Sequence, residues 1–199
     1  MLAFHELEQA PFYIFTAFIF SYATGELHVT RNFLLAAVLC AAFVSFFSIP
    51  VFGHMSDRIG RRRMYLAGAL VTFFFGFAYF GMLNSGSAGW IFVAVILSLV
   101  PHDMMYGPQA ALIAEAFTPR LRYSGASMGY QLASIIAGGP APLIAAWLFA
   151  HYHTGYAVAW YIAICGVLSI VATLLLPDYT NRDVSQEYDE PALRRAAPA

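Results

Sequence analysis

Residues 53–63 read GHMSDRIGRRR and lie between two long apolar runs, residues 33–52 and 64–83. A helix that spans a bilayer needs about 20 predominantly apolar residues, so each run predicts one span. The four arginines and one aspartate of the connection keep it out of the hydrocarbon core, where charged side chains are costly. The stretch therefore predicts a tight polar loop that joins two transmembrane helices on one side of a membrane.

The rest of the chain repeats this pattern. Further apolar stretches cover residues 11–24, 90–117, 124–150 and 157–176. Only 11% of the residues are charged, against about 25% in a soluble domain. We predict an all-α integral membrane protein, with six transmembrane helices in residues 1–177 and a charged, disordered tail in residues 178–199. A net charge of −1 gives no basic field for nucleic acid.

The arginines orient this bundle. With six spans, the second loop, the fourth loop and the tail all lie on the same side of the membrane. Nine of the ten arginines fall in these three segments: Arg58, Arg61, Arg62, Arg63, Arg120, Arg122, Arg182, Arg194 and Arg195. The other one, Arg31, follows the first span. Positive residues favour the cytoplasmic side, so both termini are predicted to be cytoplasmic.

The loop has more structure than a charge cluster requires. Gly53 and Gly60 suit a close helix approach and a turn, and Asp57 can cap a helix start or pair with Arg58 or Arg61. The arginines, Arg62 among them, suit the phosphates of lipid headgroups. The alternative is a plain charge cluster that only fixes topology. We favour a conformational motif made of six residues: Gly53, Asp57, Arg58, Gly60, Arg61 and Arg62.

This spacing resembles the loop signature of the major facilitator superfamily, in the version found between helices eight and nine. Two later stretches, HDMMYGPQAA at residues 102–111 and RYSGASMGYQL at residues 122–132, resemble its metabolite:proton symporter family. The resemblance implies proton-coupled transport of a dicarboxylate, tricarboxylate, shikimate, betaine or proline across the bacterial inner membrane. It also implies that the chain is the C-terminal half, helices seven to twelve, of a twelve-helix carrier.

That resemblance raises an expectation about partners. The sequence begins shortly before the seventh helix of the pattern, and a carrier of this type holds its substrate between two halves. We therefore expect a separate N-terminal six-helix half, or a second copy of the chain, beside the bilayer lipids, the small-molecule substrate and protons. Alternatives are a gene fragment, a mis-assigned start, or an assembly partner that transports nothing.

The run at residues 90–117 carries ionisable groups at membrane depth, where they indicate function by default. Asp103, Tyr106 and Gln109 lie near Pro101 and Pro108, which remove backbone donors and bend the helix. The resemblance places this helix beside the cavity. We predict substrate or coupling contacts for the three polar residues; the alternative for Asp103 is an interhelical or periplasmic-side hydrogen bond, for example with His102.

Other candidates lie in neighbouring spans. Tyr130 and Gln131 share one polar helix face, and Tyr13 of the first span is a further cavity candidate. Glu115 is expected near the cytoplasmic end of its span, where it can pair with Arg122 as a latch. The sequence GGPAP at residues 138–142 predicts an interrupted helix, as carriers have. With no Arg or Lys at mid-membrane depth, a cation for an anionic substrate would come from the other half.

An intramembrane enzyme is the alternative from another class. The spans show no Ser–His pairing, no Asp-rich metal cluster and no His-x-x-x-His spacing that would support catalysis. We expect neither a catalytic residue nor a metal or cofactor, and we predict that the chain is not an enzyme.

Overall fold

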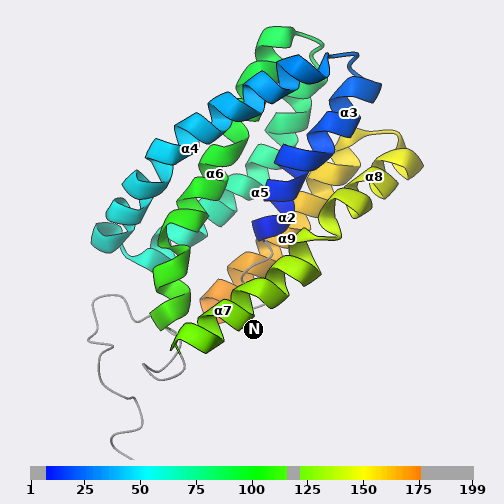
Figure 1. Cartoon of the computed structure of the whole chain (residues 1–199). Helices are drawn as coiled ribbons and strands as arrows, with labels where there is room; N and C mark the ends of the chain where they lie inside the picture. Colours follow the sequence, from blue (N-terminus) through cyan, green and yellow to red (C-terminus); the bar gives the residue numbers. More distant parts are fainter. Residues whose placement is uncertain (1–7, 116–121, 176–199) are drawn as a thin grey trace, which may run out of the picture.

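A computed structural model describes residues 8–115 and 122–175 of the chain, and all the regular structure in these ranges is helical (Figure 1). The elements in chain order are α2 (Gln9–Tyr13), η2 (Ile14–Phe18), α3 (Ile19–Gly25), α4 (Arg31–Ile59), α5 (Arg61–Leu83), α6 (Ala88–Glu115), α7 (Arg122–Ala133), η3 (Ser134–Gly138), α8 (Ala141–Tyr152) and α9 (Gly155–Leu175). The tail predicted at residues 178–199 lies outside the described residues.

Five helices are long and apolar enough to cross a membrane: α4, α5, α6, the broken helix Tyr123–Tyr152 and α9. The first helix runs through α2, η2 and α3, from Gln9 to Gly25, and is shorter. Its crossing of the bilayer stays a prediction. The chain is thus an all-α membrane bundle, as the apolar runs predicted.

The loop motif is more helical than the sequence indicated. α4 continues to Ile59 and α5 begins at Arg61, so only Gly60 separates the two helices. Gly60 has φ 107°, a value that side chains disfavour, and its N–H donates to the carbonyl of Ser56 at 2.9 Å. The polar residues are helical because α4 and α5 extend beyond their apolar runs before the chain turns.

Three helix pairs build most of the bundle. α4 packs along α6, and α5 lies between α6 and α9 (Figure 1). The main core combines aromatic and aliphatic side chains and includes the buried residues Phe15, Tyr79, Phe80 and Ile162. Large apolar side chains are also exposed on the outside, as a bilayer requires: Leu39, Phe43, Phe47, Leu70, Phe74, Leu143, Trp147 and Trp160 are examples.

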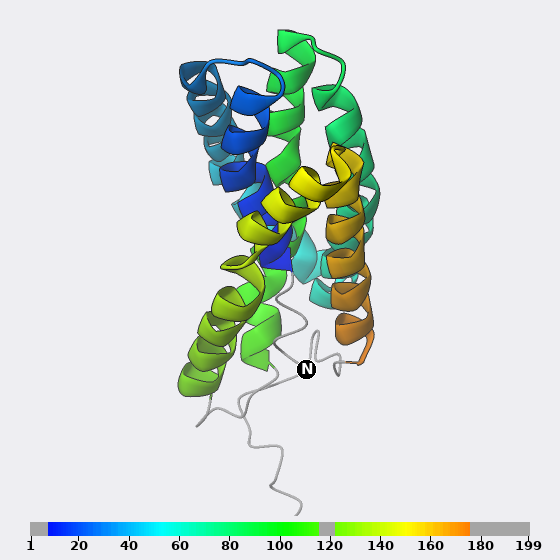
Figure 2. The same cartoon turned by 90° about the vertical axis from the view of Figure 1, so that its right-hand side faces the viewer.

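The fifth transmembrane helix is interrupted. α7 ends in the wide π-helical turn η3, and α8 begins after Gly139 and Pro140. The N–H of Gly139 donates to the carbonyl of Ser134 at 3.0 Å, which closes the π turn. Figure 2 shows α7 and α8 as two segments with a visible break. The interruption predicted from residues 138–142 is confirmed.

Candidate functional site

A cavity of about 590 Å³ lies between the first helix, α4, α6 and α7. Its lining combines aromatic rings with a few polar groups: Gln9, Phe12, Tyr13, Thr16, Val38, Ala42, Ser45, Phe46, Ile49, Leu99, His102, Asp103, Tyr106 and Tyr130. A mostly apolar pocket with convergent polar groups is the usual form of a small-molecule site. The volume also lies in the range of such sites, about 300–1,000 Å³.

Asp103 is the ionisable carboxylate of this cavity. It lies near the middle of α6, roughly 20 Å along the axis from either helix end. Only 1% of its surface is exposed. Ser48 of α4 donates a hydrogen bond to Oδ2 of Asp103, and Oδ1 has no hydrogen-bond partner among the described residues. The carboxylate thus has an interhelical partner, and that partner is Ser48 rather than His102.

His102 is held between two aromatic rings in the same wall. Its ring centroid lies 4.8 Å from that of Phe12 and 5.4 Å from that of Tyr106, on which it stacks. Stacking of this kind fixes the plane of the imidazole. Nδ1 of His102 and Nε2 of Gln9 are buried and have no hydrogen-bond partner among the described residues. These two nitrogens, Asp103 Oδ1 and the Oγ of Ser45, which also has no partner among the described residues, are the polar atoms left for a ligand or for water.

Tyr13 is positioned by the two π-helical turns. The turn η2 follows it directly, and its ring lies against η3: a Cβ built on Gly138 would lie 2.6 Å from Cε2 of Tyr13. A side chain at position 138 would therefore displace the tyrosine. π turns occur often at functional sites; here η2 contributes Thr16 to the cavity lining, and η3 packs against α2 beside Tyr13.

The six cavity candidates from the sequence lie in different environments. Tyr13, Asp103, Tyr106 and Tyr130 line the cavity. Gln109 is buried, with 2% of its surface exposed, and does not line it. Gln131, the residue after Tyr130, is exposed and also does not line it. Whether any of the six binds substrate stays a prediction.

Sequence reasoning missed the polar residues on the first helix and on α4. Gln9 and Thr16 are spaced seven residues apart on the first helix, which is two helical turns. Ser45 and Ser48 are spaced three apart and form a short polar stripe in the apolar part of α4. A search for polar stripes within apolar runs, rather than for charges, would have found these four residues.

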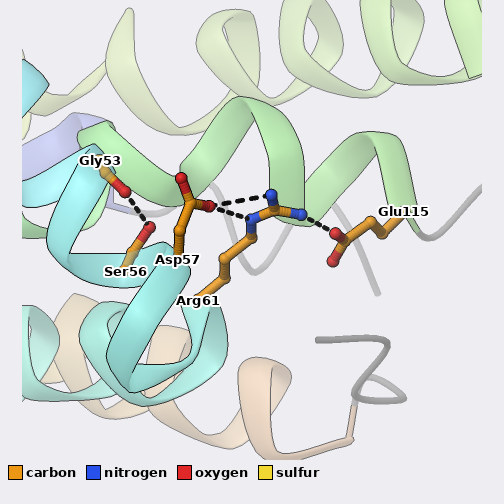
Figure 3. A network of polar contacts seen from close by, with 5 residues as sticks. All are labelled: Gly53, Ser56, Asp57, Arg61 and Glu115. Carbon is orange, nitrogen blue, oxygen red and sulfur yellow. Dashed lines mark hydrogen bonds and ion pairs between the residues drawn. The ribbon is translucent and has the colours of Figure 1, made fainter. Parts of the chain in front are cut away.

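At the other end of α4 and α6 lies an ionic network (Figure 3). Nη2 of Arg61 is 3.0 Å from Oδ1 of Asp57, and Nη1 of Arg61 pairs with Glu115 of α6. The hydroxyl of Ser56 donates to the carbonyl of Gly53 at 2.7 Å. One guanidinium therefore connects α4, α5 and α6. The sequence left Arg58 and Arg61 as possible partners of Asp57, and in the structure the partner is Arg61.

Further arginines of the motif have distinct environments. Nη2 of Arg62 donates to the carbonyl of Leu174 at 2.6 Å, which ties α5 to the last turn of α9. An arginine suits this place because the last carbonyls of a helix have no partner within it. Arg58 is exposed. Glu115 pairs with Arg61; the side chain of Arg122 lies outside the described residues, so its part in a latch stays a prediction.

A helical membrane bundle with a small-molecule-sized cavity and an ionic network at the helix ends is typical of membrane carriers. The sequence profile of the Major Facilitator Superfamily matches residues 9–197. The chain belongs to this superfamily.

Several relatives are similar over most of the chain. The shikimate transporter of Escherichia coli is 35% identical over 180 residues, 89% of this chain and 41% of the relative. The inner membrane metabolite transport protein YhjE of Escherichia coli is 36% identical over 169 residues, 82% of this chain and 38% of the relative. The glycine betaine/proline/ectoine/pipecolic acid transporter OusA of Dickeya dadantii is 26% identical, over 86% of this chain and 34% of the relative. The chain spans about two fifths of the length of these relatives or less.

Proposed function

We propose that the chain is the C-terminal half of a carrier that moves a small metabolite by proton symport. The observation that carries this proposal is the cavity, in which four buried polar atoms have no hydrogen-bond partner among the described residues: Asp103 Oδ1, His102 Nδ1, Gln9 Nε2 and Ser45 Oγ. Buried polar groups are normally satisfied, so these atoms suit a polar ligand that comes and goes. In this proposal Tyr13, Tyr106 and Tyr130 contact the substrate.

The names of the relatives, which include shikimate, betaine and proline transporters, support a substrate of this class. Shikimate, betaine and proline each carry a carboxylate. Among the described residues that line the cavity there is no arginine or lysine. The cation that binds a substrate carboxylate would therefore lie on a second wall of the cavity. The wall formed by the present chain would contact the ring, hydroxyl or ammonium part of the substrate.

The second wall is a partner in this proposal. Carriers of this kind work by moving two halves relative to each other around a central site. A separate N-terminal six-helix half would supply the other wall, or a second copy of this chain would do so. Under either arrangement the ionic network of Asp57, Arg61 and Glu115 would lie on the cytoplasmic side, where both termini are proposed to be.

Two alternatives lead to different measurements. A non-transporting fragment or assembly partner would keep the fold and move no substrate, and an intramembrane enzyme would convert its substrate. The relatives are named transporters, which favours transport over catalysis.

The test is uptake into proteoliposomes that contain the purified chain, either as an assembled dimer or together with a candidate first half. Labelled shikimate, glycine betaine, proline and citrate would be supplied outside, with acid outside and neutral buffer inside. We expect accumulation of one of them, and its loss when a protonophore collapses the gradient. Uptake that ignores the gradient would contradict symport but keep transport. No uptake of any of them by an assembled complex would favour the non-transporting alternative.

A further inference from the structure

We propose that Asp103 and Ser48 form the proton-binding site of this half, and that their hydrogen bond reports the proton's presence to α4. This proposal rests on the proposed function, because it assigns the coupling step of that transport to one pair of residues. The proton comes from water on the acidic side, converts the carboxylate of Asp103 to a neutral acid, and leaves to water on the other side.

The environment of Asp103 is suited to a group that changes charge. The carboxylate is 1% exposed, lies near the middle of a membrane-spanning helix and lines the cavity. Among the described residues it forms no ion pair with a cation, so as an anion it relies on serine hydroxyls of α4: Ser48 donates to it, and Ser45 lies beside it. A charge at this depth costs at least a few kcal/mol. Binding a proton removes that cost, and in this proposal the cavity is the path by which the released proton reaches water.

The hydrogen bond from Ser48 couples the protonation state of Asp103 to a second helix, α4. Ser48 can donate to an ionised carboxylate, and it can accept from a neutral acid, so the pair has two hydrogen-bond arrangements. About one turn further along both helices, the backbones of α4 and α6 touch at Gly53 and Gly107. Beyond that crossing lie Asp57, Arg61 and Glu115. A shift of α4 against α6 at Asp103 would therefore change the geometry of the ionic network.

Other titratable groups also surround Asp103. His102 and Tyr106 stand beside it on α6, Tyr13 faces the cavity from the first helix, and Tyr130 faces it from α7. Glu8, just before α2, is buried but does not line the cavity, and α4 lines it with Ser45 but no ionisable side chain. Of these groups only histidine ordinarily titrates near neutral pH. The test must therefore separate His102 from Asp103.

The first experiment detects the proton directly and needs no transport. Infrared difference spectra of the purified chain in lipid nanodiscs, recorded as the pH is lowered, would show the carbonyl stretch of protonated carboxylic acids. We expect one component of this band, sensitive to D2O, to be missing in Asp103→Asn and to remain in His102→Gln. Glu26→Gln is the matched control, because Glu26 is an exposed carboxylate of a loop. A band in Asp103→Asn that is identical to that of the wild type would overturn the proposal.

The second experiment separates coupling from binding. In proteoliposomes of the assembled carrier, Asp103→Asn is expected to lose at least tenfold of gradient-driven accumulation while it retains exchange of internal for external substrate. Ser48→Ala should lower accumulation and Ser48→Thr, which keeps the hydroxyl, should restore it. Normal accumulation by Asp103→Asn would overturn the proposal and leave the transport function intact. A wild-type carrier that moves no substrate would contradict the proposed function, and the infrared experiment would still decide the protonation of Asp103.

Discussion

Gly107 of α6 lies directly against the backbone of α4 at Gly53. A Cβ built on Gly107 would lie 2.9 Å from the nitrogen of Gly53 and 2.9 Å from the carbonyl oxygen of Ile49. The contact is not symmetric, since a Cβ on Gly53 would lie 3.5 Å from the carbonyl oxygen of Gly107, an ordinary van der Waals distance. This crossing separates the cavity with Asp103 from the ionic network, and small residues are what allow membrane helices to approach so closely.

The asymmetry predicts different outcomes for the same substitution at the two glycines. Gly107→Ala would push its methyl group into the backbone of α4, and overpacking of this kind costs about 1–3 kcal/mol. We expect the midpoint of thermal unfolding of the purified protein to fall by about 2–12 °C. Gly53→Ala is the matched control and should leave the midpoint nearly unchanged. Equal midpoints for the two variants would mean that the helices do not cross at this pair.

The ionic network predicts a second asymmetry. Glu115 is nearly buried, with 9% of its side chain exposed, whereas 54% of the Asp57 side chain is exposed. Arg61→Gln leaves a buried carboxylate without its cation and should destabilise the protein by about 1–3 kcal/mol, less than a fully buried pair would cost. Asp57→Asn should cost under about 1 kcal/mol, because exposed pairs contribute little. Chemical unfolding of the purified variants would measure both.

A double variant tests the partner assignment in this network. Arg61→Gln combined with Glu115→Gln removes both charges, so it should be more stable than Arg61→Gln alone. Arg63→Gln serves as the control for the loss of one loop arginine, because Arg63 is exposed. Strictly additive effects of the two single substitutions would contradict a direct pair between Arg61 and Glu115.

Transport should depend on Asp57 more strongly than stability does. If Asp57 orders Arg61 in one state of the carrier, Asp57→Asn in the assembled carrier should lower uptake several-fold while membrane insertion stays normal. The measurement is initial uptake rate, normalised to the amount of protein in the membrane. Unchanged uptake would reduce the loop motif to the plain topology signal that the sequence also allowed.

The sequence predicted the helices well because a membrane places one simple constraint on the backbone. Each backbone polar group must be satisfied within its own helix, so apolar runs of sufficient length indicate their own structure. The same simplicity explains the error at residues 53–63: charge located the turn but did not show that α4 continues through Asp57 to Ile59. Where a helix ends outside the hydrocarbon core depends on local groups, here the φ angle of Gly60.

The cavity was less predictable than the helices. Charge and motif identified Asp103, but its partner Ser48 stands 55 positions away in the chain on another helix, and nothing in a single sequence pairs the two. Gln109 shares a helix with Asp103 yet lies outside the cavity lining, because the choice of face depends on how α6 rotates against its neighbours. Spacing along one helix shows which polar residues share a face, and packing against neighbouring helices decides whether that face lines the cavity.

The distribution of arginines predicts the orientation of the bundle. A reporter fused after Ala199 should be cytoplasmic, and one inserted near Ser87, in the turn between α5 and α6, should be periplasmic. Paired phosphatase and fluorescent-protein fusions would read the two sides. The reverse pattern at either site would contradict the positive-inside assignment.

The last prediction is that a monomer of this chain does not accumulate substrate. The cavity wall includes Tyr106, of which 41% is exposed, and Tyr13, of which 37% is exposed. Alternating access needs two bodies that move around the site. A monomer in a bilayer would leave polar groups of this wall against lipid, at roughly 2–7 kcal/mol for each group without a hydrogen bond. The chain should therefore associate with a separate first half or with a second copy of itself.

The test of this prediction combines mass photometry or crosslinking in nanodiscs with uptake into proteoliposomes under a proton gradient. We expect a dimer or a mixed complex, and accumulation only in preparations that contain it. Accumulation of shikimate, citrate, betaine or proline by a demonstrated monomer would contradict the two-wall requirement. A dimer that accumulates substrate, and loses accumulation in Asp103→Asn, would show that two copies of this half can supply both walls. In such a dimer the second wall can come only from the second copy, and Asp103 would act as the coupling residue within that assembly.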